Sequence, residues 1–370
     1  NAQDMFYNTD INGNFIYANE RCIQLFGFKN DSVKGKNSLF LVAPEYRERV
    51  EQFYRDQFTN RIHHTYLEFP IKSRDGKQFW VGQNVTMIYE PGSRKRISGF
   101  IALARDITEK RANELLIDQQ NKDITSSINS AKRIQFNLLP SPKQLGNYFD
   151  ESFVIFKPKD IVSGDFFWLE EIDGKLIIAL ADSTGHGVPG AFMTIVGINL
   201  LNQIVRERKV LEPQEILAQL NTELAKTLPK NESGSYMDGI DLLIAVLEND
   251  QLTYATSGVG LIHVSEGNLF YSRSTKLTEE NDETYTQHQL TISPQDQFYF
   301  LTNGYQKQIG SIYNKKFSYQ RIQELLEKIH PESMALQKKY FENAWVNWSE
   351  GHEQTDDITI IGLKGYRAKN

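Results

Sequence analysis

A long segment without glycine or proline divides this chain into parts. Residues 109–139 contain neither residue, and Pro140 is the first to interrupt the run. Glycine and proline are the least favourable residues inside a helix, so the segment is predicted to form one continuous helix. Turn residues and short apolar runs return on either side. We therefore expect three parts: residues 1–108, a helical linker over 109–148, and residues 149–370.

The composition is that of an ordinary globular protein. The chain has 370 residues, of which 40% are hydrophobic and 24% charged, close to the averages for folded domains. At roughly 150 residues per domain, this length predicts two or three domains. A formal net charge of −6 and a pI of about 5.8 argue against a nucleic-acid-binding surface.

The expected location is the cytoplasm. Cys22 is the single cysteine, which excludes an internal disulfide and a cysteine-rich zinc site and suits a reducing compartment. We expect no membrane span, because no run approaches the roughly 18 apolar residues that one needs. No secretory signal is visible. Because the sequence begins with Asn1 and not with methionine, we expect it to be a piece of a longer protein.

The linker carries a heptad-like pattern. Its recurring positions alternate steps of four and three, and they are Ile117, Asn121, Ile124, Ile128, Ala131, Gln135 and Leu138. Such spacing suits a seam between helices, where a polar residue fixes register at some loss of stability. The segment is either one long helix packed on its own domains or, as we expect, a parallel coiled coil that makes a homodimer.

Short apolar runs in the third part are predicted to be strands, and longer periodic runs to be helices. The strand-like runs are residues 153–156, 176–180, 242–247, 252–255 and 298–301, and the helical runs are 191–208, 213–228 and 318–329. The strands come in adjacent pairs and the helices in separate groups. This favours an antiparallel sheet with segregated helices over βαβ units, so the fold class is α+β.

Acidic or amide side chains stand repeatedly where predicted strands meet turns. These are Asp165 after Gly164, Asp182 at the end of an apolar run, Asn303 before Gly304, and Asp356 before the run 358–363. Each alone is typical of a turn, but four in one domain indicate a shared site. Converging carboxylates repel unless a cation holds them, and oxygen ligands suit Mg²⁺ or Mn²⁺. Two such ions about 3.5–4 Å apart can activate a water and clamp a phosphoryl group.

Three motifs carry a resemblance to a known family. They are Asp165-Phe166-Phe167, Asp182-Ser183-Thr184-Gly185-His186-Gly187-Val188-Pro189-Gly190-Ala191, and Asp356-Asp357-Ile358-Thr359. In this order they resemble the PPM-type metal-dependent serine/threonine phosphatases, most closely the bacterial stage II sporulation protein E branch. The segment 132–141 is also typical of that branch. The resemblance covers about residues 130–365 and implies an αββα sandwich with two Mn²⁺ or Mg²⁺ ions between its sheets.

The resemblance implies roles for five residues. Asp182 would bridge both ions, the backbone carbonyl of Ser183 would serve one ion, and Asp356 would bind the other. Asn303 stands where the family has an aspartate ligand. Asp165 would order metal-bound water or touch the metal directly. Asp165 and Asp182 are therefore the expected catalytic residues.

Two further positions have open interpretations. His186 either shapes the turn into the next helix or acts directly, and the family's eukaryotic branch carries its acid histidine at a different offset. The stretch Asp238-Gly239-Ile240-Asp241 matches a subgroup motif. One of its carboxylates would reach a third, weaker metal site, or the stretch is a turn before a strand.

Two departures from the family pattern bear on activity. At Asn303 the amide keeps an oxygen ligand but removes one negative charge, which should weaken the second metal. The segment 276–281 has no match to the family's Met-Pro-Ile-Gly-like loop. Both differences point toward reduced catalysis, or toward a phosphatase-shaped protein that only binds.

The first part resembles a PAS domain over residues 1–110. The resemblance rests on Asp10, Gly13-Asn14-Phe15, Tyr17-Ala18-Asn19 and the closing Arg105-Asp106-Ile107-Thr108-Glu109. It implies a five-stranded antiparallel sheet with flanking helices and a ligand that the sequence does not identify. Cys22 lacks the context of a flavin-binding cysteine and is expected in the core. His63 and His64 are expected on an exposed strand and not at a haem.

These features predict a PAS-regulated phosphatase. Its reaction would be hydrolysis of phosphoserine or phosphothreonine on a protein, by attack of metal-bound water on phosphorus. The family resemblance suggests an anti-sigma-factor antagonist as the phosphorylated partner. The alternative is a pseudophosphatase that recognises a partner without turnover.

Overall fold

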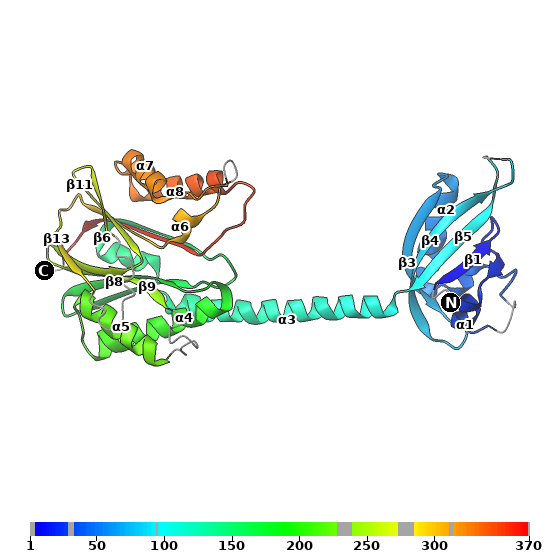
Figure 1. Cartoon of the computed structure of the whole chain (residues 1–370), viewed down its shortest axis with the longest axis horizontal. Helices are drawn as coiled ribbons and strands as arrows, with labels where there is room; N and C mark the ends of the chain where they lie inside the picture. Colours follow the sequence, from blue (N-terminus) through cyan, green and yellow to red (C-terminus); the bar gives the residue numbers. More distant parts are fainter. Residues whose placement is uncertain are drawn as a thin grey trace. The chain divides into compact units, whose positions relative to one another are not determined.

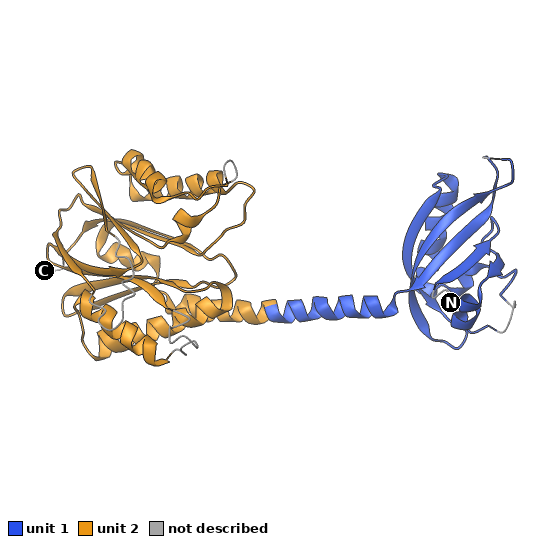
Figure 2. Ribbon diagram, viewed as in Figure 1, with its two compact units in different colours: residues 1–124 blue, residues 125–370 orange. Residues whose placement is uncertain are grey.

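The computed structural model describes residues 4–28, 33–93, 95–227, 239–272, 285–310 and 314–368. The chain divides into two compact units, residues 1–124 and 125–370 (Figure 2). Helix α3, Thr108–Leu138, runs through this division (Figure 1). It confirms the continuous helix that the sequence predicts between the two folded parts.

A five-stranded antiparallel sheet forms the first unit, in the order β2-β1-β5-β4-β3. Its strands are β1 (Met5–Thr9), β2 (Phe15–Ala18), β3 (His64–Lys72), β4 (Gln78–Tyr89) and β5 (Ile97–Asp106). Its helices are α1 (Glu20–Phe26) and α2 (Arg47–Thr59), with 3₁₀ turns η1 (Ser38–Leu41) and η2 (Pro44–Tyr46). Strands β3 and β4 pair antiparallel and form a hairpin, with residues 73–77 as the connection.

Local signals set the limits of α1. The side chain of Asn19 accepts a hydrogen bond from the Cys22 backbone N–H at 3.0 Å and caps the first turn. Gly27 ends the helix with a φ of 76°, a backbone region that favours glycine. Cys22 is fully buried in the apolar core of this unit, as predicted. His63 and His64 are exposed at the start of β3.

Helix α3 is fixed at its two ends and exposed between them. Near its start, the Arg111 guanidinium lies 2.7 Å from the Glu68 carboxylate and 4.5 Å from the centre of the Trp80 ring. Near its end, Gln135 is buried against the second unit. Ile124 in the middle is 58% exposed. An apolar residue exposed on a long helix suits the predicted seam, and the coiled coil stays a prediction.

Two five-stranded sheets form the second unit, in the orders β13-β10-β9-β8-β7 and β12-β11-β14-β15-β6. The first contains β7 (Asp165–Ile172), β8 (Lys175–Ser183), β9 (Ile240–Glu248), β10 (Gln251–Ser257) and β13 (Gln287–Thr291). The second contains β6 (Phe149–Lys157), β11 (Gly260–Ser265), β12 (Asn268–Ser272), β14 (Gln297–Leu301) and β15 (Ile358–Tyr366). The helices are α4 (Gly187–Leu201), the π-helical η4 (Asn202–Glu207), α5 (Pro213–Thr227), α6 (Gly304–Lys307), α7 (Tyr319–Ile329) and α8 (Met334–Ser349), with a 3₁₀ turn η3 (Pro142–Asn147).

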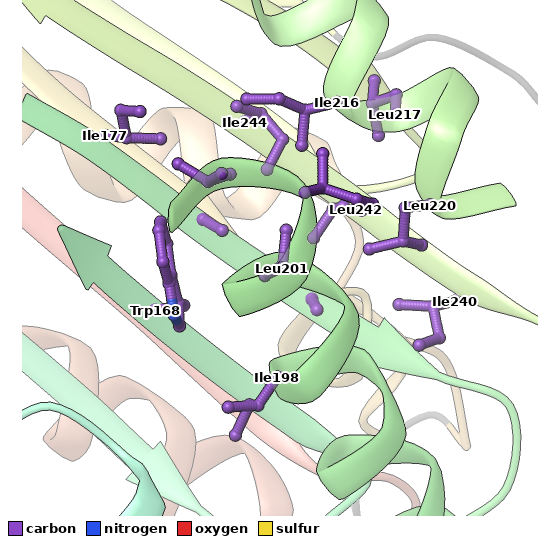
Figure 3. Packing of buried hydrophobic residues seen from close by; sticks show 14 of the residues in the cluster. Trp168, Ile177, Ile198, Leu201, Ile216, Leu217, Leu220, Ile240, Leu242 and Ile244 are labelled. Carbon is purple, nitrogen blue, oxygen red and sulfur yellow. The ribbon is translucent and has the colours of Figure 1, made fainter. Parts of the chain in front are cut away.

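Apolar clusters hold these elements in four layers. Side chains such as Leu180 and Phe300 meet between the two sheets. Helices α4 and α5 cover the outer face of the first sheet, where Leu201 and Leu220 pack near Trp168 and strand side chains (Figure 3). Helices α7 and α8 cover the second sheet (Figure 1). The arrangement is the αββα sandwich that the resemblance implies.

One helical stretch has the length and apolar composition of a membrane span, which the sequence analysis did not expect of any segment. Residues Gly187–Glu207 form a helix long and apolar enough, by composition, to cross a membrane. The expectation that no segment would qualify is therefore wrong for this stretch. Half of its apolar window is buried in the fold, and Ile198 and Leu201 belong to the core beneath the first sheet (Figure 3). Packing against a sheet accounts for the same apolar composition.

Candidate metal centre

A row of three aspartates crosses the first sheet. Asp165 begins β7, and the strand register pairs Asp165 with Asp182 and Asp182 with Asp241. Directly opposed residues of antiparallel strands project from the same face. Asp165 contacts two side chains of the facing sheet, so the row points into the space between the sheets. Asp165 thus stands where a turn meets a strand, as predicted, and it is the first residue of that strand.

Asp165 is almost fully enclosed, with 1% of its surface exposed. Its Oδ2 accepts hydrogen bonds from the hydroxyls of Thr302 and Thr359, each at 2.8 Å. Burial raises the pKa of Asp165 well above its ordinary value, and the charge of Asp182 raises it further. The two threonine hydroxyls lower this pKa. Both threonines belong to the second sheet or its edge, so one sheet fixes the carboxylate of the other.

The second sheet brings an amide, a carboxylate and an ammonium to the same end. Asn303 follows β14 and Asp356 precedes β15, and these two strands are paired neighbours. The Nζ of Lys307 lies 2.9 Å from Oδ2 of Asp356. The Oδ1 atom of Asn303 is buried and has no hydrogen-bond partner among the residues that the structure describes. An amide oxygen in that situation destabilises the fold unless a donor or a cation meets it.

The pKa of Asp182 is shifted by charged residues from both sheets. Burial raises its pKa to about 7, and the carboxylates of Asp356 and Asp241 act in the same direction. The positive charge of Lys307 and a hydrogen bond from the backbone of Asn303 lower this pKa. Residues of β9, of α6 and of the segment before β15 therefore act electrostatically on one carboxylate of β8. This is the behaviour expected where a cation is to be held.

The two adjacent aspartates before β15 have different partners. Asp357 is buried, and its carboxylate accepts the backbone N–H groups of Lys159 and Gly164, each at 2.7 Å. It therefore holds the loop that leads into β7. Asp356 instead pairs with Lys307 and influences the pKa of Asp182. The charge of Asp356 therefore acts on Asp182, and the charge of Asp357 acts on Asp165.

The backbone before Asp165 is held from several sides. The Ser183 hydroxyl donates to the carbonyl of Gly164 at 2.7 Å, and the Thr194 hydroxyl on α4 donates to the carbonyls of Ser163 and Gly164 at 3.1 Å. The Gln135 side chain binds both backbone groups of Ser163. Gln135 was expected on an intermolecular seam, but it is buried against this loop. The side chain of Ser183 thus supports the segment that carries Asp165, and the proposed role of its carbonyl stays a prediction.

His186 lies at the rim and not in the row. It is the residue before α4, its Nδ1 is 2.6 Å from the Asp160 carboxylate, and its Nε2 is 2.9 Å from Lys159 Nζ. The side chains of His186 and Asp160 are 48% and 46% exposed. Gly187, with a φ of 67°, opens the helix directly after it. This geometry favours the turn-shaping interpretation over a direct contact with the carboxylates.

The donor set fits a hard divalent cation. All the candidate donors are oxygen atoms, which Mg²⁺ and Mn²⁺ prefer, and the unmatched Oδ1 of Asn303 is the acceptor that a cation would satisfy. Within the described ranges, no three His, Cys, Asp or Glu side chains form a metal-ligating group by themselves. A cation bound here would therefore need amide, backbone or water oxygens as well. Asp238 and the segment 276–281 lie outside the described residues.

Several contributors to the site escaped prediction. Lys307 carried no motif signal, and Gln135 was assigned to another role. Thr359 is part of a motif quoted above, but no role was predicted for it. Thr302 directly precedes Asn303, and no role was predicted for it either. Their side chains could have been suspected as hydroxyl donors to a buried carboxylate, because such groups need hydrogen-bond partners.

The fold and the carboxylate row define a PP2C-type phosphatase domain in a chain that also has a PAS domain. The chain belongs to the stage II sporulation protein E (SpoIIE) family, whose sequence profile matches residues 172–365, more than half of the chain. A PAS-domain profile matches residues 3–109. Both matches confirm the resemblances that the motifs carry. No curated protein sequence matches the chain.

Several solved structures are similar to parts of this chain. The SiaA-PP2C domain of Pseudomonas aeruginosa is 24% identical with a TM-score of 0.60, and the match covers 66% of this chain and 98% of that one. A PAS domain from Colwellia psychrerythraea is 23% identical with a TM-score of 0.27, over 29% of this chain and 89% of that one. The SpoIIE phosphatase domain of Bacillus subtilis is 15% identical with a TM-score of 0.42, over 60% and 92%. The likeness to the SiaA-PP2C domain confirms the sandwich fold.

Proposed function

We propose that the chain is a PAS-regulated protein phosphatase that hydrolyses phosphoserine or phosphothreonine on a partner protein. The observation that carries this proposal is the meeting of the Asp165, Asp182 and Asp241 row with Asn303 and Asp356 at one end of the sandwich. Acidic side chains from two sheets gather there despite mutual repulsion, and burial together with the charges of Asp356 and Asp241 raises the pKa of Asp182 to about 7. This repulsion is electrostatically unfavourable unless a bound cation offsets it, so the arrangement indicates a cation-binding site.

The roles of the side chains follow from their positions. Asp182, Asn303 and Asp356 would hold Mn²⁺ or Mg²⁺ through oxygen atoms, with the carbonyl of Ser183 as a further donor. When bound, two such ions would supply an activated water and neutralise charge on a phosphoryl group. Asp165, held by the Thr302 and Thr359 hydroxyls, would orient that water or bind the metal directly. Asp241 lies next to Asp182 in the register and would serve a third, weaker site.

A second candidate function is supported by the same end of the sandwich. Asn303 offers a dipole where the family has a full charge, and Lys307 already carries a positive charge next to Asp356. Both features reduce the attraction for a second cation. A pseudophosphatase that binds a phosphorylated partner without turnover is therefore the alternative, and a slow enzyme that needs a high metal concentration is the function we favour.

The wider organisation is part of the proposal. We assign residues 1–108 to the PAS sensor, 109–148 to the helical linker and 149–370 to the phosphatase domain. The exposed face of α3 around Ile124 would pair two chains in a cytoplasmic homodimer. The partner would be a phosphorylated protein such as an anti-sigma-factor antagonist.

Phosphate release from a phosphoserine peptide by the full chain tests the proposed function. We expect release that depends on millimolar Mn²⁺ and that disappears in Asp182→Ala. A close active relative serves as the positive control for the peptide. If the chain releases no phosphate while the relative does, the enzyme proposal fails and the binding module remains.

A further inference from the structure

Lys307 is a cation that the chain itself places at the candidate metal centre. Its Nζ is 2.9 Å from Oδ2 of Asp356, and the two side chains are 45% and 26% exposed. The other oxygen of Asp356 accepts the backbone N–H of Asp357 at 3.0 Å. The carboxylate proposed as a metal ligand is therefore already engaged through both of its oxygen atoms.

The position of Lys307 is built into the backbone. It is the last residue of α6, and its N–H donates to the carbonyl of Asn303 at 3.0 Å. The helix is held against the start of β15, because a Cβ atom on Gly304 would lie 1.9 Å from the carbonyl oxygen of Asp357. Only glycine permits this approach. The short helix therefore keeps Lys307 within reach of Asp356.

An ammonium and a divalent cation compete for such a carboxylate. A protonated lysine has three donors and no acceptor, so it cannot be a ligand beside the metal. Two positive charges at one carboxylate also repel each other, and this repulsion is strong in a partly buried site. The amide of Asn303 adds no charge that would offset it. A metal that binds Asp356 has to move the ammonium away.

We infer that Lys307 is a tethered competitor of the second metal ion: its ammonium occupies Asp356 until a divalent ion displaces it. The inference rests on the proposed function, since it takes Asp356 as a metal ligand. The apparent affinity of the second position is then set by Lys307 together with Asn303. The other interpretation is an ordinary ion pair between α6 and β15 that stabilises the fold and has no bearing on metal.

Calorimetric titration of the full chain with Mn²⁺ separates these interpretations. Lys307→Met removes the charge and keeps an unbranched side chain of similar size. Lys328→Met, at an exposed position of α7, makes the same change in net charge away from the site and is the matched control. We expect Lys307→Met to tighten the weaker Mn²⁺ binding event by about five-fold, the ratio typical of a good partly exposed ion pair. Lys328→Met should leave it unchanged.

The direction of the change decides the question. A purely stabilising ion pair predicts unchanged or weaker Mn²⁺ binding in Lys307→Met, and that result would overturn the inference while Asp182→Ala still reports on the metal site. Absence of Mn²⁺ binding in both the wild type and Lys307→Met would overturn the metal site as well. Thermal unfolding in EDTA checks that Lys307→Met is folded, and Lys307→Gln replaces it if it is not.

Discussion

The side-chain amide of Gln135 binds both backbone groups of Ser163, two residues before the buried Asp165. Its Nε2 donates to the Ser163 carbonyl at 2.5 Å, and its Oε1 accepts the Ser163 N–H at 3.1 Å. Gln135 is 1% exposed and lies near the end of α3, the helix that begins at the PAS sheet. The linker helix is therefore hydrogen-bonded to the loop directly before β7, the strand that begins with the candidate catalytic residue Asp165.

Gln135→Ala should destabilise the phosphatase unit and weaken Mn²⁺ binding. The change leaves the N–H and carbonyl of Ser163 buried without this partner, and an unsatisfied buried polar group costs about 1–3 kcal/mol. Gln119→Ala, at an exposed position of the same helix, is the control and should change neither quantity. Urea unfolding and Mn²⁺ titration measure the two effects. Equal stability of both variants would show that the contact with Ser163 contributes nothing.

Asp182→Ala should abolish high-affinity Mn²⁺ binding without unfolding the protein. The family resemblance implies that Asp182 is the ligand shared by two ions, and its pKa responds to charges on both sheets. Calorimetry on the folded variant measures the loss. If a folded Asp182→Ala protein binds Mn²⁺ as the wild type does, the metal assignment is wrong.

The metal-free protein should lose stability as the pH rises from about 4 to 7. The pKa of Asp182 is raised from its ordinary value of 3.8 to about 7 in the folded state, so the folded state binds more protons across this window than the unfolded state. Stability is therefore highest below the unfolded pKa and falls as Asp182 ionises, by an amount on the order of a few kcal/mol. The raised pKa of Asp165 acts in the same direction.

Urea unfolding in EDTA at pH 5 and pH 8 measures this loss. Asp182→Asn should flatten the dependence, because it removes the titrating group and keeps its shape. Saturating Mn²⁺ should stabilise the wild type most at pH 8, where Asp182 is ionised. A metal-free protein that is more stable at pH 8 than at pH 5 would contradict the linkage.

Motifs and periodicity predict a large part of this molecule, because they are local signals. Strands β6, β8, β9, β10, β14 and β15 and helices α4, α5 and α7 follow from apolar runs, whereas β7, β11, β12 and β13 were not predicted. Asp182 and Asp356 follow from acidic turns. Helix α8 (Met334–Ser349) was not predicted. Its buried face includes the polar Gln337 between Met334 and Phe341, so the apolar stripe that marks a helix is interrupted.

The missed parts of the site are long-range contacts. Thr302 and Thr359 meet Asp165 across 137 and 194 residues of sequence. Lys307 meets Asp356 across 49 residues. The hydrophobic pattern of a strand sets which of its faces is buried. It does not say which residues of two different sheets meet across the core, and the polar contacts of this site depend on that.

Charged replacements at the linker seam should dissociate a dimer. If Ile124 and Ile128 lie between two helices, Ile124→Glu and Ile128→Glu each bury an unpaired charge at a cost of several kcal/mol. Ile124 is exposed in the single chain, so the same change should leave the stability of a monomer nearly unaltered. Light scattering at micromolar concentration measures the mass. A monomeric wild type would reject the seam.

Asn303→Asp should lower the Mn²⁺ concentration for half-maximal activity and raise the rate. A carboxylate contributes a full charge to a divalent ion, whereas the amide oxygen that is now buried without a hydrogen-bond partner among the described residues offers a dipole. We expect about a ten-fold gain, or about 1.4 kcal/mol. Asn303→Ala removes the oxygen altogether and should weaken metal binding below that of the wild type. The measurement is a Mn²⁺ titration of phosphopeptide hydrolysis for the three proteins. Tighter Mn²⁺ binding without phosphate release in Asn303→Asp would leave the metal site in place and favour the pseudophosphatase, because the ligand would then be restored in a domain that lacks turnover for other reasons.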